Sequence, residues 1–237
     1  MSLTQLTRIL GLLALGCSAA TPGARPHDMS AENHEAAAKA HQQASEEHAA
    51  EYNPEAREAR ERCALSPKAV RNACWSSVRN PTAIHARQAA AHRRHAADHR
   101  AASGALRDAE ALACAGLGQD DRDISPFAHR EDIAGVEPLR EPSNNPKIRG
   151  TRTVGAVVTL RAVQGMTAEW LQRIVDCHIA RSSALGHVVP EMPYCPLVPK
   201  GVSATVSSAG GGFRISIRAE DEAGAREVLA RAERLAP

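Results

Sequence analysis

The chain has 237 residues, with 29 basic and 27 acidic side chains and a formal net charge of +2. This near balance excludes a protein that binds polyanions through gross charge, and it excludes an acidic solvating tail. Hydrophobic residues make up 43% of the chain, but 46 residues are alanines. We therefore expect an α+β protein, in which an alanine-rich helical N-terminal part precedes a small α/β domain that holds the hydrophobic core.

Residues 1–16 have the composition of a cleaved export signal. Their apolar stretch is too short to span a membrane as a helix. The run Ala14-Leu15-Gly16-Cys17 resembles the lipobox of bacterial lipoproteins, although Leu is commoner than Ala at the third residue before the cysteine. The resemblance implies that Cys17 is lipidated and becomes the first residue, and that Ser18 favours the outer membrane. An ordinary secretory signal is the alternative.

Residues 17–29 are expected to form a tether off the membrane, and residues 30–118 a helical, histidine-rich region. Three prolines that follow Asn or Ser mark helix starts there, because the polar side chain can cap a helix and Pro fits the first turn. The first and last helices could pair as a long antiparallel hairpin. The four predicted helices lie near residues 30–52, 54–64, 67–78 and 81–115.

The remaining elements are expected to form a linker and a small domain. Residues 119–152 carry several prolines and are predicted to be a linker or docking loop. Residues 153–237 are predicted to contain a strand, a helix capped by Thr167, a strand hairpin that turns at glycines 210–212, and a last helix. This β-α-β-β-α order matches a ferredoxin-like sandwich that lacks its last strand.

Eight of the eleven histidines lie between residues 27 and 99, and all of them except His95 fall in two series with a spacing of seven. Because seven residues are nearly two helical turns, each series forms a row along one helix face. Histidines seven apart are about 10 Å apart, so a shared ion needs ligands from a partner helix. His48 and Glu51 form an additional pair at a spacing of three. The candidate metal ligands are His34, His41, His48, His85, His92, His95 and His99.

Metal binding is one of three interpretations of these rows. Neutral imidazole is the commonest metal ligand, and zinc, copper or nickel would suit imidazole combined with carboxylate. The rows could instead titrate at mildly acidic pH and loosen a helix pair without metal. They could also be ordinary solvated or packed histidines on amphipathic helices.

Five cysteines remain once Cys17 carries lipid, and in an oxidising compartment disulfides are the default expectation. The odd number leaves at least one thiol free, ligated or paired between chains. None of the spacings is C-x-x-C, which argues against a redox motif or a zinc ribbon. The candidate pairs are Cys177–Cys195 and Cys63–Cys74, with Cys114 as an alternative partner.

Residues 125–133 are the best loop candidate for a further functional site, because His129 and Asp132 lie there beside an aromatic residue. The alternative is a docking segment whose apolar side chains are buried while its charges stay solvated. His178 is expected to be a core histidine with a backbone partner. Motifs typical of serine hydrolases, zinc proteases, P-loop proteins and dinucleotide-binding enzymes are missing from the sequence. An enzyme is therefore the least favoured hypothesis.

Four short motifs in the C-terminal half carry a resemblance. They are Cys114-Ala115-Gly116-Leu117, Ser125-Pro126-Phe127, His129-Arg130-Glu131-Asp132-Ile133 and Thr167-Ala168-Glu169-Trp170-Leu171-Gln172. With them, about half the chain resembles uncharacterised lipoproteins of high-GC Gram-negative bacteria. The resemblance implies no activity.

These observations together predict a non-enzymatic lipoprotein of the bacterial outer membrane that faces the periplasm. It would be attached to the membrane by its N-terminal lipid and bind transition-metal ions through the histidine rows. The alternative is a cell-envelope scaffold that binds another envelope protein without metal. Nucleic acid is not an expected partner, because the charge is balanced and the sequence offers no aromatic platform.

Overall fold

The chain was analysed as a computed structural model, which describes residues 30–64, 73–142, 150–190 and 192–236, with the backbone alone for 60–64 and 73–76. The predicted combination of helix and sheet is confirmed. The chain divides into two compact units, which we call the helix-pair unit (residues 30–108) and the α/β unit (residues 109–237). The predicted export signal, the predicted lipidation site at Cys17 and the predicted tether lie outside the described residues.

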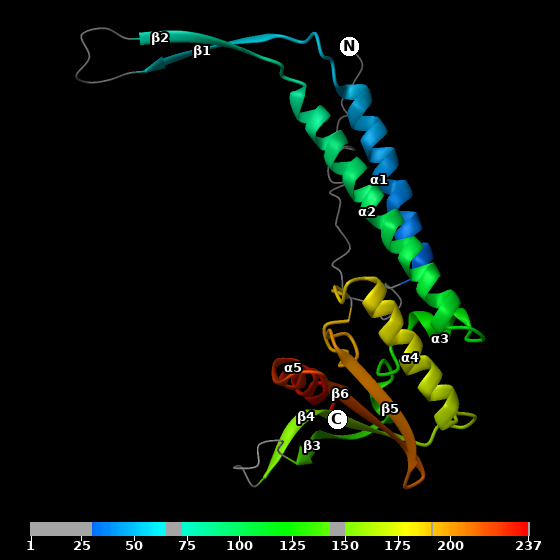
Figure 1. Ribbon diagram of the computed structural model, residues 1–237. Helices are drawn as coiled ribbons and strands as arrows, with labels where there is room; N and C mark the ends of the chain where they lie inside the picture. The colour runs from blue at the N-terminus through cyan, green and yellow to red at the C-terminus, as the bar shows by residue number, and fades with distance from the viewer. Residues whose placement is uncertain (1–29, 65–72, 143–149, 191, 237) are drawn as a thin grey trace, which may run out of the picture. The chain divides into compact units, whose positions relative to one another are not determined.

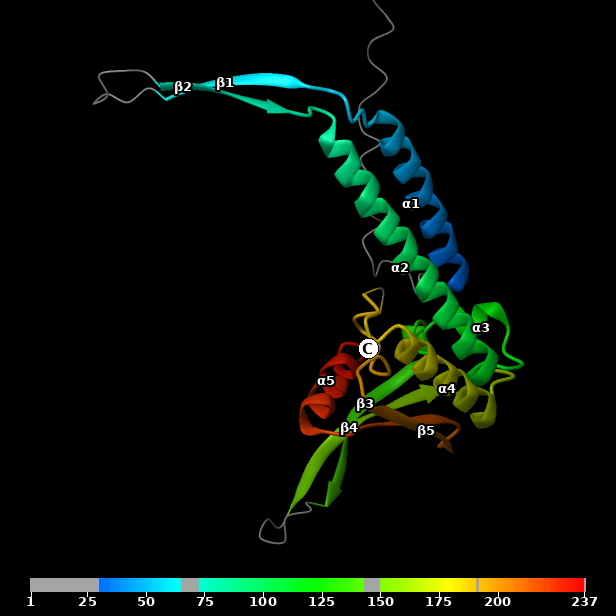
Figure 2. The same ribbon diagram turned by 45° about the horizontal axis from the view of Figure 1, so that its top comes forward.

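Two long helices, α1 (Ala31–Glu51) and α2 (Ala83–Ala113), build the helix-pair unit and lie side by side in Figures 1 and 2. Ser30 caps α1, because its hydroxyl accepts a hydrogen bond from the N–H of Asn33 at 3.0 Å. The last turn of α2 belongs to the α/β unit. The boundary between the two units therefore follows residue 108, whereas the helical region was predicted to extend to residue 118.

Small residues spaced by seven fill the contact between α1 and α2. The Ser45 hydroxyl donates to the carbonyl of Ala89 at 3.0 Å, and the Ser103 hydroxyl donates to the carbonyl of Ala31 at 2.9 Å. Each bond joins a side chain of one helix to the backbone of the other, which requires a close approach that larger residues would prevent. We call these buried residues the small-residue seam: Ala31, Ala38, Ser45, Ala89, Ala96 and Ser103.

The chain between α1 and α2 forms an antiparallel ribbon, so the two short helices predicted within residues 54–78 are wrong. Strand β1 (Glu58–Ala64) pairs with β2 (Ala73–Arg79). Cys63 and Cys74 are directly opposite each other in the backbone register. Their side chains lie outside what the structure describes, so the Cys63–Cys74 disulfide stays a prediction.

Asn53 explains why no helix begins at residue 54, and Asn80 holds the other end of the ribbon. Asn53 accepts a hydrogen bond from the N–H of Glu55 at 2.9 Å, which is the geometry of an Asx turn and not of a helix cap. Asn80 donates through Nδ2 to the carbonyl of Asn53 at 2.8 Å, which ties together the two ends of the ribbon. Strand pairing therefore overrides the helix propensity of this segment.

The α/β unit is built on a four-stranded antiparallel sheet in the order β3-β4-β6-β5. Because β6 is antiparallel to both neighbours, β4 and β5 run parallel to each other and are joined through α4. Helix α4 packs against β5, and α5 packs against β4, β6 and β3 (Figure 1). The bounds are β3 (Ile133–Pro142), β4 (Thr151–Arg161), α4 (Ala168–Ala184), β5 (Val202–Ala209), β6 (Gly212–Ala219) and α5 (Glu222–Glu233).

Strand β3 and the short helix α3 (Gln119–Asp123) occupy part of residues 119–152, so the predicted linker is wrong. Pro138 and Pro142 are compatible with β3 because it is an edge strand, where a missing N–H need not break a ladder bond. The sheet therefore has one strand more than the predicted three-stranded sandwich, and the additional strand pairs with β4.

The hydrophobic core lies between the sheet and the two helices. Strand β4 is buried continuously over 154–158, whereas β6 alternates: Phe213, Ile215 and Ile217 are buried and Arg214 is exposed. The alternation is the one predicted from the sequence, because side chains of a strand point to opposite faces in turn. The face of β6 away from the core is therefore polar.

The disulfide of the α/β unit joins Cys114 to Cys177, with a Cα–Cα distance of 4.8 Å. The predicted pair Cys177–Cys195 is wrong, because Cys195 is a buried free thiol. Its Sγ lies 3.3 Å from Nε2 of His178, the residue that follows Cys177 on α4. Successive helix residues point about 100° apart, so Cys177 and Cys195 lie on different sides of the helix.

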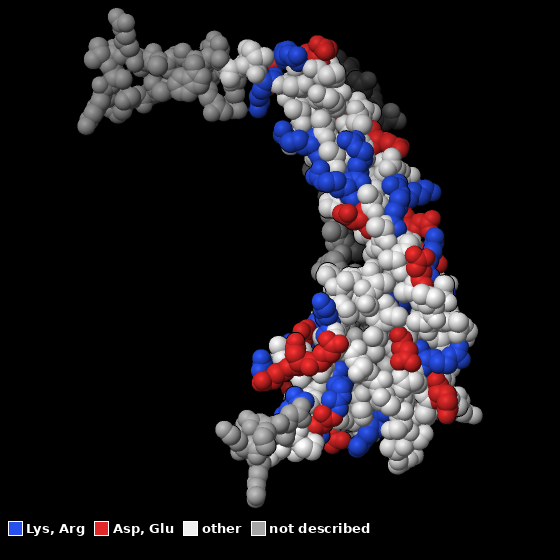
Figure 3. Space-filling view, viewed as in Figure 1, with Lys and Arg blue, Asp and Glu red and all other residues white. Residues whose placement is uncertain are grey.

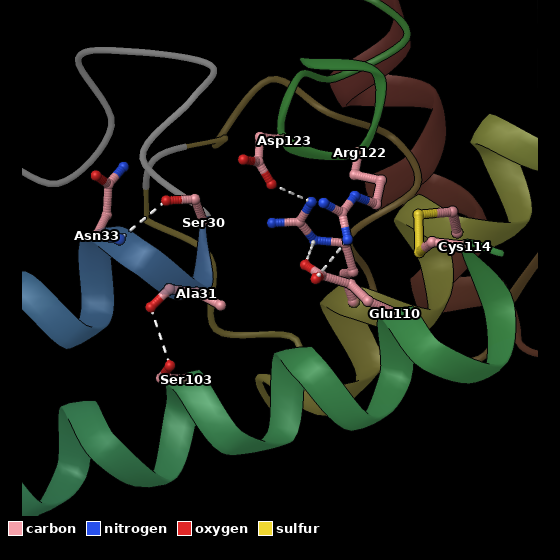
Figure 4. A network of polar contacts seen from close by, with 10 residues as sticks. Ser30, Ala31, Asn33, Ser103, Glu110, Cys114, Arg122 and Asp123 are labelled. Atoms are coloured by element: carbon pink, nitrogen blue, oxygen red, sulfur yellow. Dashed lines mark hydrogen bonds and ion pairs between the residues drawn. A yellow bond between two sulfur atoms is a disulfide. The ribbon is translucent and has the colours of Figure 1, made fainter. Parts of the chain in front are cut away.

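A buried arginine on α4 forms ion pairs with the carboxylates of Glu110 and Asp123, which Figure 4 labels. Arg181 has no exposed surface, and its Nη1 donates to Oδ1 of Asp123 at 2.6 Å. Its Nε lies 3.4 Å from Oε1 of Glu110, whose other oxygen accepts from Arg122 at 3.1 Å. The end of α2, α3 and α4 are therefore joined by ion pairs as well as by the disulfide.

Among the described residues, none of the helices has the length and apolar character needed to cross a membrane. On the face shown in Figure 3, basic and acidic side chains are interspersed over both units. This distribution agrees with the near-zero net charge of the chain.

Candidate metal centre

The histidine rows of α1 and α2 face each other beside the small-residue seam. The facing histidines follow one antiparallel register. Seven residues further along α1, the histidine faces a residue seven positions earlier on α2. We call this arrangement the histidine ladder. Between Nδ1 atoms, its facing pairs are His34–His99 at 3.0 Å, His41–His92 at 3.0 Å and His48–His85 at 3.5 Å.

The common spacing of seven explains why the ladder forms. On α1, His34 lies three residues after Ala31 and four before Ala38, so it borders the seam on the same helix face. On α2, His92 lies between Ala89 and Ala96 in the same way. Wherever the small residues bring the two helices together, they therefore also bring a histidine of each row together.

All seven candidate ligands take part in the ladder. Each has the ring of a histidine on the other helix within 5.7 Å, measured between ring centroids. In the structure the two histidine rows face each other in an antiparallel register. The helical period alone determines which side chains share a face, and it places these histidines in two rows.

One end of the ladder has three converging ligand atoms, contributed by His48, Glu51 and His85. Oε2 of Glu51 lies 2.7 Å from Nδ1 of His85 and 3.2 Å from Nδ1 of His48. These atoms all lie within 4.8 Å of one another. Ligand atoms on a tetrahedral zinc ion, bound at about 2.0–2.1 Å, are about 3.3 Å apart. The three atoms therefore have the size of one face of such a coordination shell.

Solvent can reach this end of the ladder. The side chains of His48 and His85 are 27% and 31% exposed, and that of Glu51 is 56% exposed. An ion on the three atoms would keep a coordination position open to water, as in zinc sites with three protein ligands, whereas structural zinc sites are closed by four protein ligands. An ion in solvent can therefore reach the three atoms.

The middle of the ladder is made of imidazoles alone. The ring of His41 lies 5.2 Å from that of His92, 5.3 Å from that of His95 and 5.5 Å from that of His99. Partial burial lowers the pKa of His41, and the charges that the three neighbouring rings can carry lower it further. The lowered pKa favours the neutral imidazole, which is the form that binds metal.

The loop site predicted at His129 and Asp132 has a different arrangement. Nδ1 of His129 lies 3.3 Å from Oε1 of Glu131, and these two side chains are 66% and 73% exposed. The neighbouring Phe127 and Ile133 are completely buried. This is the arrangement expected of the alternative, a docking segment whose apolar residues anchor it and whose charges are solvated.

Sequence reasoning missed a buried polar cluster in the α/β unit. Sγ of Cys195 lies 3.3 Å from Nε2 of His178 and accepts a hydrogen bond from the Ser125 hydroxyl at 3.6 Å. His178 thus has a thiol as its partner instead of the predicted backbone group. The three residues come from distant segments whose sequence holds no common motif, so only the tertiary structure reveals the cluster.

This cluster is neutral near pH 7. Burial raises the pKa of the Cys195 thiol to about 11. Burial, and secondarily the charge of Arg181, lowers the pKa of His178 to about 3. A reactive cysteine needs a thiolate in an exposed, electropositive environment, so Cys195 lacks the properties of a catalytic nucleophile.

Lowering the pH from 7 to 5 is expected to destabilise the α/β unit through His178. In the unfolded chain this imidazole binds a proton near pH 6.5, whereas in the folded chain it resists protonation down to about pH 3. The unfolded state therefore binds more protons, and stability falls as the pH drops below 6.5, by about 2 kcal/mol at pH 5.

Urea unfolding at both pH values measures this loss, followed by Trp170 fluorescence in a Trp75→Phe background. His178→Gln should remove about 2 kcal/mol of the difference between pH 7 and pH 5, because glutamine does not titrate. An equal pH dependence in the wild type and in His178→Gln would contradict the assignment.

Comparison of the chain with protein-family models, with curated proteins and with solved structures found no match.

Proposed function

We propose that this protein binds transition-metal ions at the histidine ladder and acts as a metal-binding or metal-buffering protein. The observation that carries the proposal is the convergence of His48, Glu51 and His85. Two imidazoles and one carboxylate are a donor set that suits zinc, copper or nickel. The opposing helix supplies the ligands that a single row, with its spacing of about 10 Å, cannot supply.

Exposure of the ligands supports a buffering role over a structural one. The helices α1 and α2 are already held together by the small-residue seam and by the hydrogen bonds of Ser45 and Ser103. An ion is therefore not needed to assemble the pair, and its open coordination position allows exchange.

We further propose that the protein is anchored by lipid at Cys17 in the outer membrane and faces the periplasm. The support is the lipobox-like run that ends at Cys17. The Cys114–Cys177 disulfide is consistent with an oxidising compartment, because disulfides persist there and are rare in the cytosol. Metal buffering would then take place in the envelope.

Glu51→Gln is expected to weaken zinc binding at the end of the ladder by at least tenfold. The amide keeps the shape of the side chain but removes the negative charge. Changing even a group that only orients a metal ligand lowers metal affinity by roughly 10–100-fold. Isothermal titration of the full, tag-free chain with zinc chloride at pH 7.5 measures the affinity.

Glu47→Gln is the matched control, because Glu47 is exposed on the same helix and is not one of the three converging residues. The control should bind zinc like the wild type. The proposal would fail if the wild type bound no zinc, copper or nickel, or if the Glu51 and Glu47 variants bound zinc equally well.

A further inference from the structure

The ribbon of β1 and β2 has unpaired strand edges. It is a sheet of two strands, and within the part of the chain that the structure describes no third strand pairs with either of them. The two strands contact each other far more than they contact any other described element. Each outer edge of the ribbon therefore presents backbone N–H and C=O groups to which a further strand could bind.

Both faces of the ribbon are open to solvent where its side chains are described. Glu58 and Ala59, which follow each other on β1, are exposed, as are Ser77 and Val78 on β2. Because successive residues of a strand point to opposite faces, neither face is covered there. A ribbon of two strands is marginally stable at best in water, whereas a sheet of three or more strands can be stable. The ribbon would therefore gain stability from an additional strand.

The charges of β1 make this strand complementary to a reversed copy of itself. The sequence from residue 57 is Arg57-Glu58-Ala59-Arg60-Glu61. In an antiparallel pair of two such segments centred on Ala59, Glu58 is at the position opposite Arg60 of the second copy. Arg57 is likewise opposite Glu61 of the second copy. Opposite charges directly across an antiparallel pair stabilise it, and like charges destabilise it.

The neighbouring registers all bring like charges together. A shift by one position puts Arg57 opposite Arg60 of the second copy, or Glu58 opposite Glu61 of the second copy, depending on its direction. A shift by two positions puts Glu58 or Arg60 opposite the same residue of the second copy. Charged residues commonly protect a strand edge from pairing. Here their order penalises these other registers and permits the one centred on Ala59.

We infer that β1 pairs with β1 of a second copy of this chain, antiparallel and centred on Ala59, so that the protein forms a symmetric dimer. The two ribbons then form one sheet of four strands, and the twofold axis makes the contact between Glu58 and Arg60 occur twice. Backbone hydrogen bonds along the edges supply affinity, and the charges fix the register. Strand β2 has a single charged residue, Arg79, and so lacks such a pattern. The inference goes beyond the proposed function, because it uses no residue of the histidine ladder.

Sedimentation equilibrium of the full, tag-free chain in EDTA tests the inference, because the chelator excludes a dimer that is bridged by metal. The wild type should be a dimer. Arg60→Glu and Glu58→Arg should each weaken the dimer by at least about tenfold, since each variant puts two like-charge pairs in the place of two opposite-charge pairs. An equimolar mixture of the two variants should form the dimer again, because every acidic position of a mixed dimer lies opposite a basic one.

Arg79→Glu is the matched control. It removes the exposed ion pair between Arg79 and Glu58, whose atoms are 2.8 Å apart within one ribbon, but it changes β2 and should dimerise like the wild type. A wild type that stays monomeric up to about 1 mM would overturn the inference. So would a dimer that Arg60→Glu weakens no more than Arg79→Glu does, or a mixture of Arg60→Glu and Glu58→Arg that stays monomeric.

Discussion

Replacing Cys114 and Cys177 together by serine is expected to lower the free energy of unfolding of the α/β unit by about 4 kcal/mol. The disulfide closes a loop with a sequence separation of 63 residues, and the chain-entropy model assigns a bridge of this span about 4 kcal/mol. The bond is the covalent link between the end of α2 and α4, so its loss should also loosen the contacts of α3.

Urea unfolding followed by Trp170 fluorescence in a Trp75→Phe background measures this effect. The double variant avoids a new free thiol, and a reducing agent added to the unsubstituted cysteines should reproduce most of the loss. A change below 1 kcal/mol in both experiments would show that Cys114 and Cys177 are not paired in the folded protein.

Arg181→Met is expected to destabilise the α/β unit by about 3–5 kcal/mol. Methionine occupies a similar volume but leaves the carboxylates of Asp123 and Glu110 without their buried cation. Removing one partner of a buried ion pair costs about this much, because the remaining charge is neither solvated nor compensated. Arg122, which also contacts Glu110, offsets part of the loss.

Two further variants test whether the cost of Arg181→Met comes from the burial of the ion pair and from the unpaired charges that it leaves. Arg226→Met removes an ion pair with Glu222 in which the side chains are 70% and 83% exposed, so it should cost less than about 1 kcal/mol. Arg181→Met combined with Asp123→Leu should be less harmful than Arg181→Met alone, because it removes two opposite charges together. Equal costs for Arg181→Met and Arg226→Met would contradict the network.

Several elements could be predicted because local sequence determines them. Thr167 caps α4 as predicted, accepting from the N–H of Trp170 at 3.1 Å. The hairpin β5–β6 turns at Gly210 and Gly211, whose φ values of 58° and 83° favour glycine. In these places propensity, turn chemistry and hydrophobic period all favour the same structure.

Other elements depend on partners that are distant in the sequence. Pro138 indicated a loop, and only pairing with β4 makes its segment an edge strand. The β1–β2 ribbon has good helix formers, and only the opposing strand selects the extended form. Arg181 was not expected in the core, because a buried arginine requires carboxylates that the fold brings from α2 and α3.

The histidine ladder could be predicted residue by residue, while the buried cluster around Cys195 could not. A spacing of seven places each row on one helix face, so the histidines that form the two rows follow from the period. Cys195 follows a proline-rich stretch without a period, and its contact with His178 depends on how that stretch folds over α4. Cys177 was therefore paired with Cys195 in the prediction, whereas its disulfide partner is Cys114.

The zinc K-edge X-ray absorption spectrum of the full, tag-free chain loaded with zinc most directly tests whether the ladder binds metal. Ligation by the ladder predicts a shell of nitrogen and oxygen at about 2.0–2.1 Å together with the multiple scattering of imidazole. In Glu51→Gln the zinc retained per chain, measured by the height of the absorption edge, should fall, whereas Glu47→Gln should leave it unchanged. A sulfur shell at about 2.3 Å, or a water shell without imidazole scattering, would contradict the account.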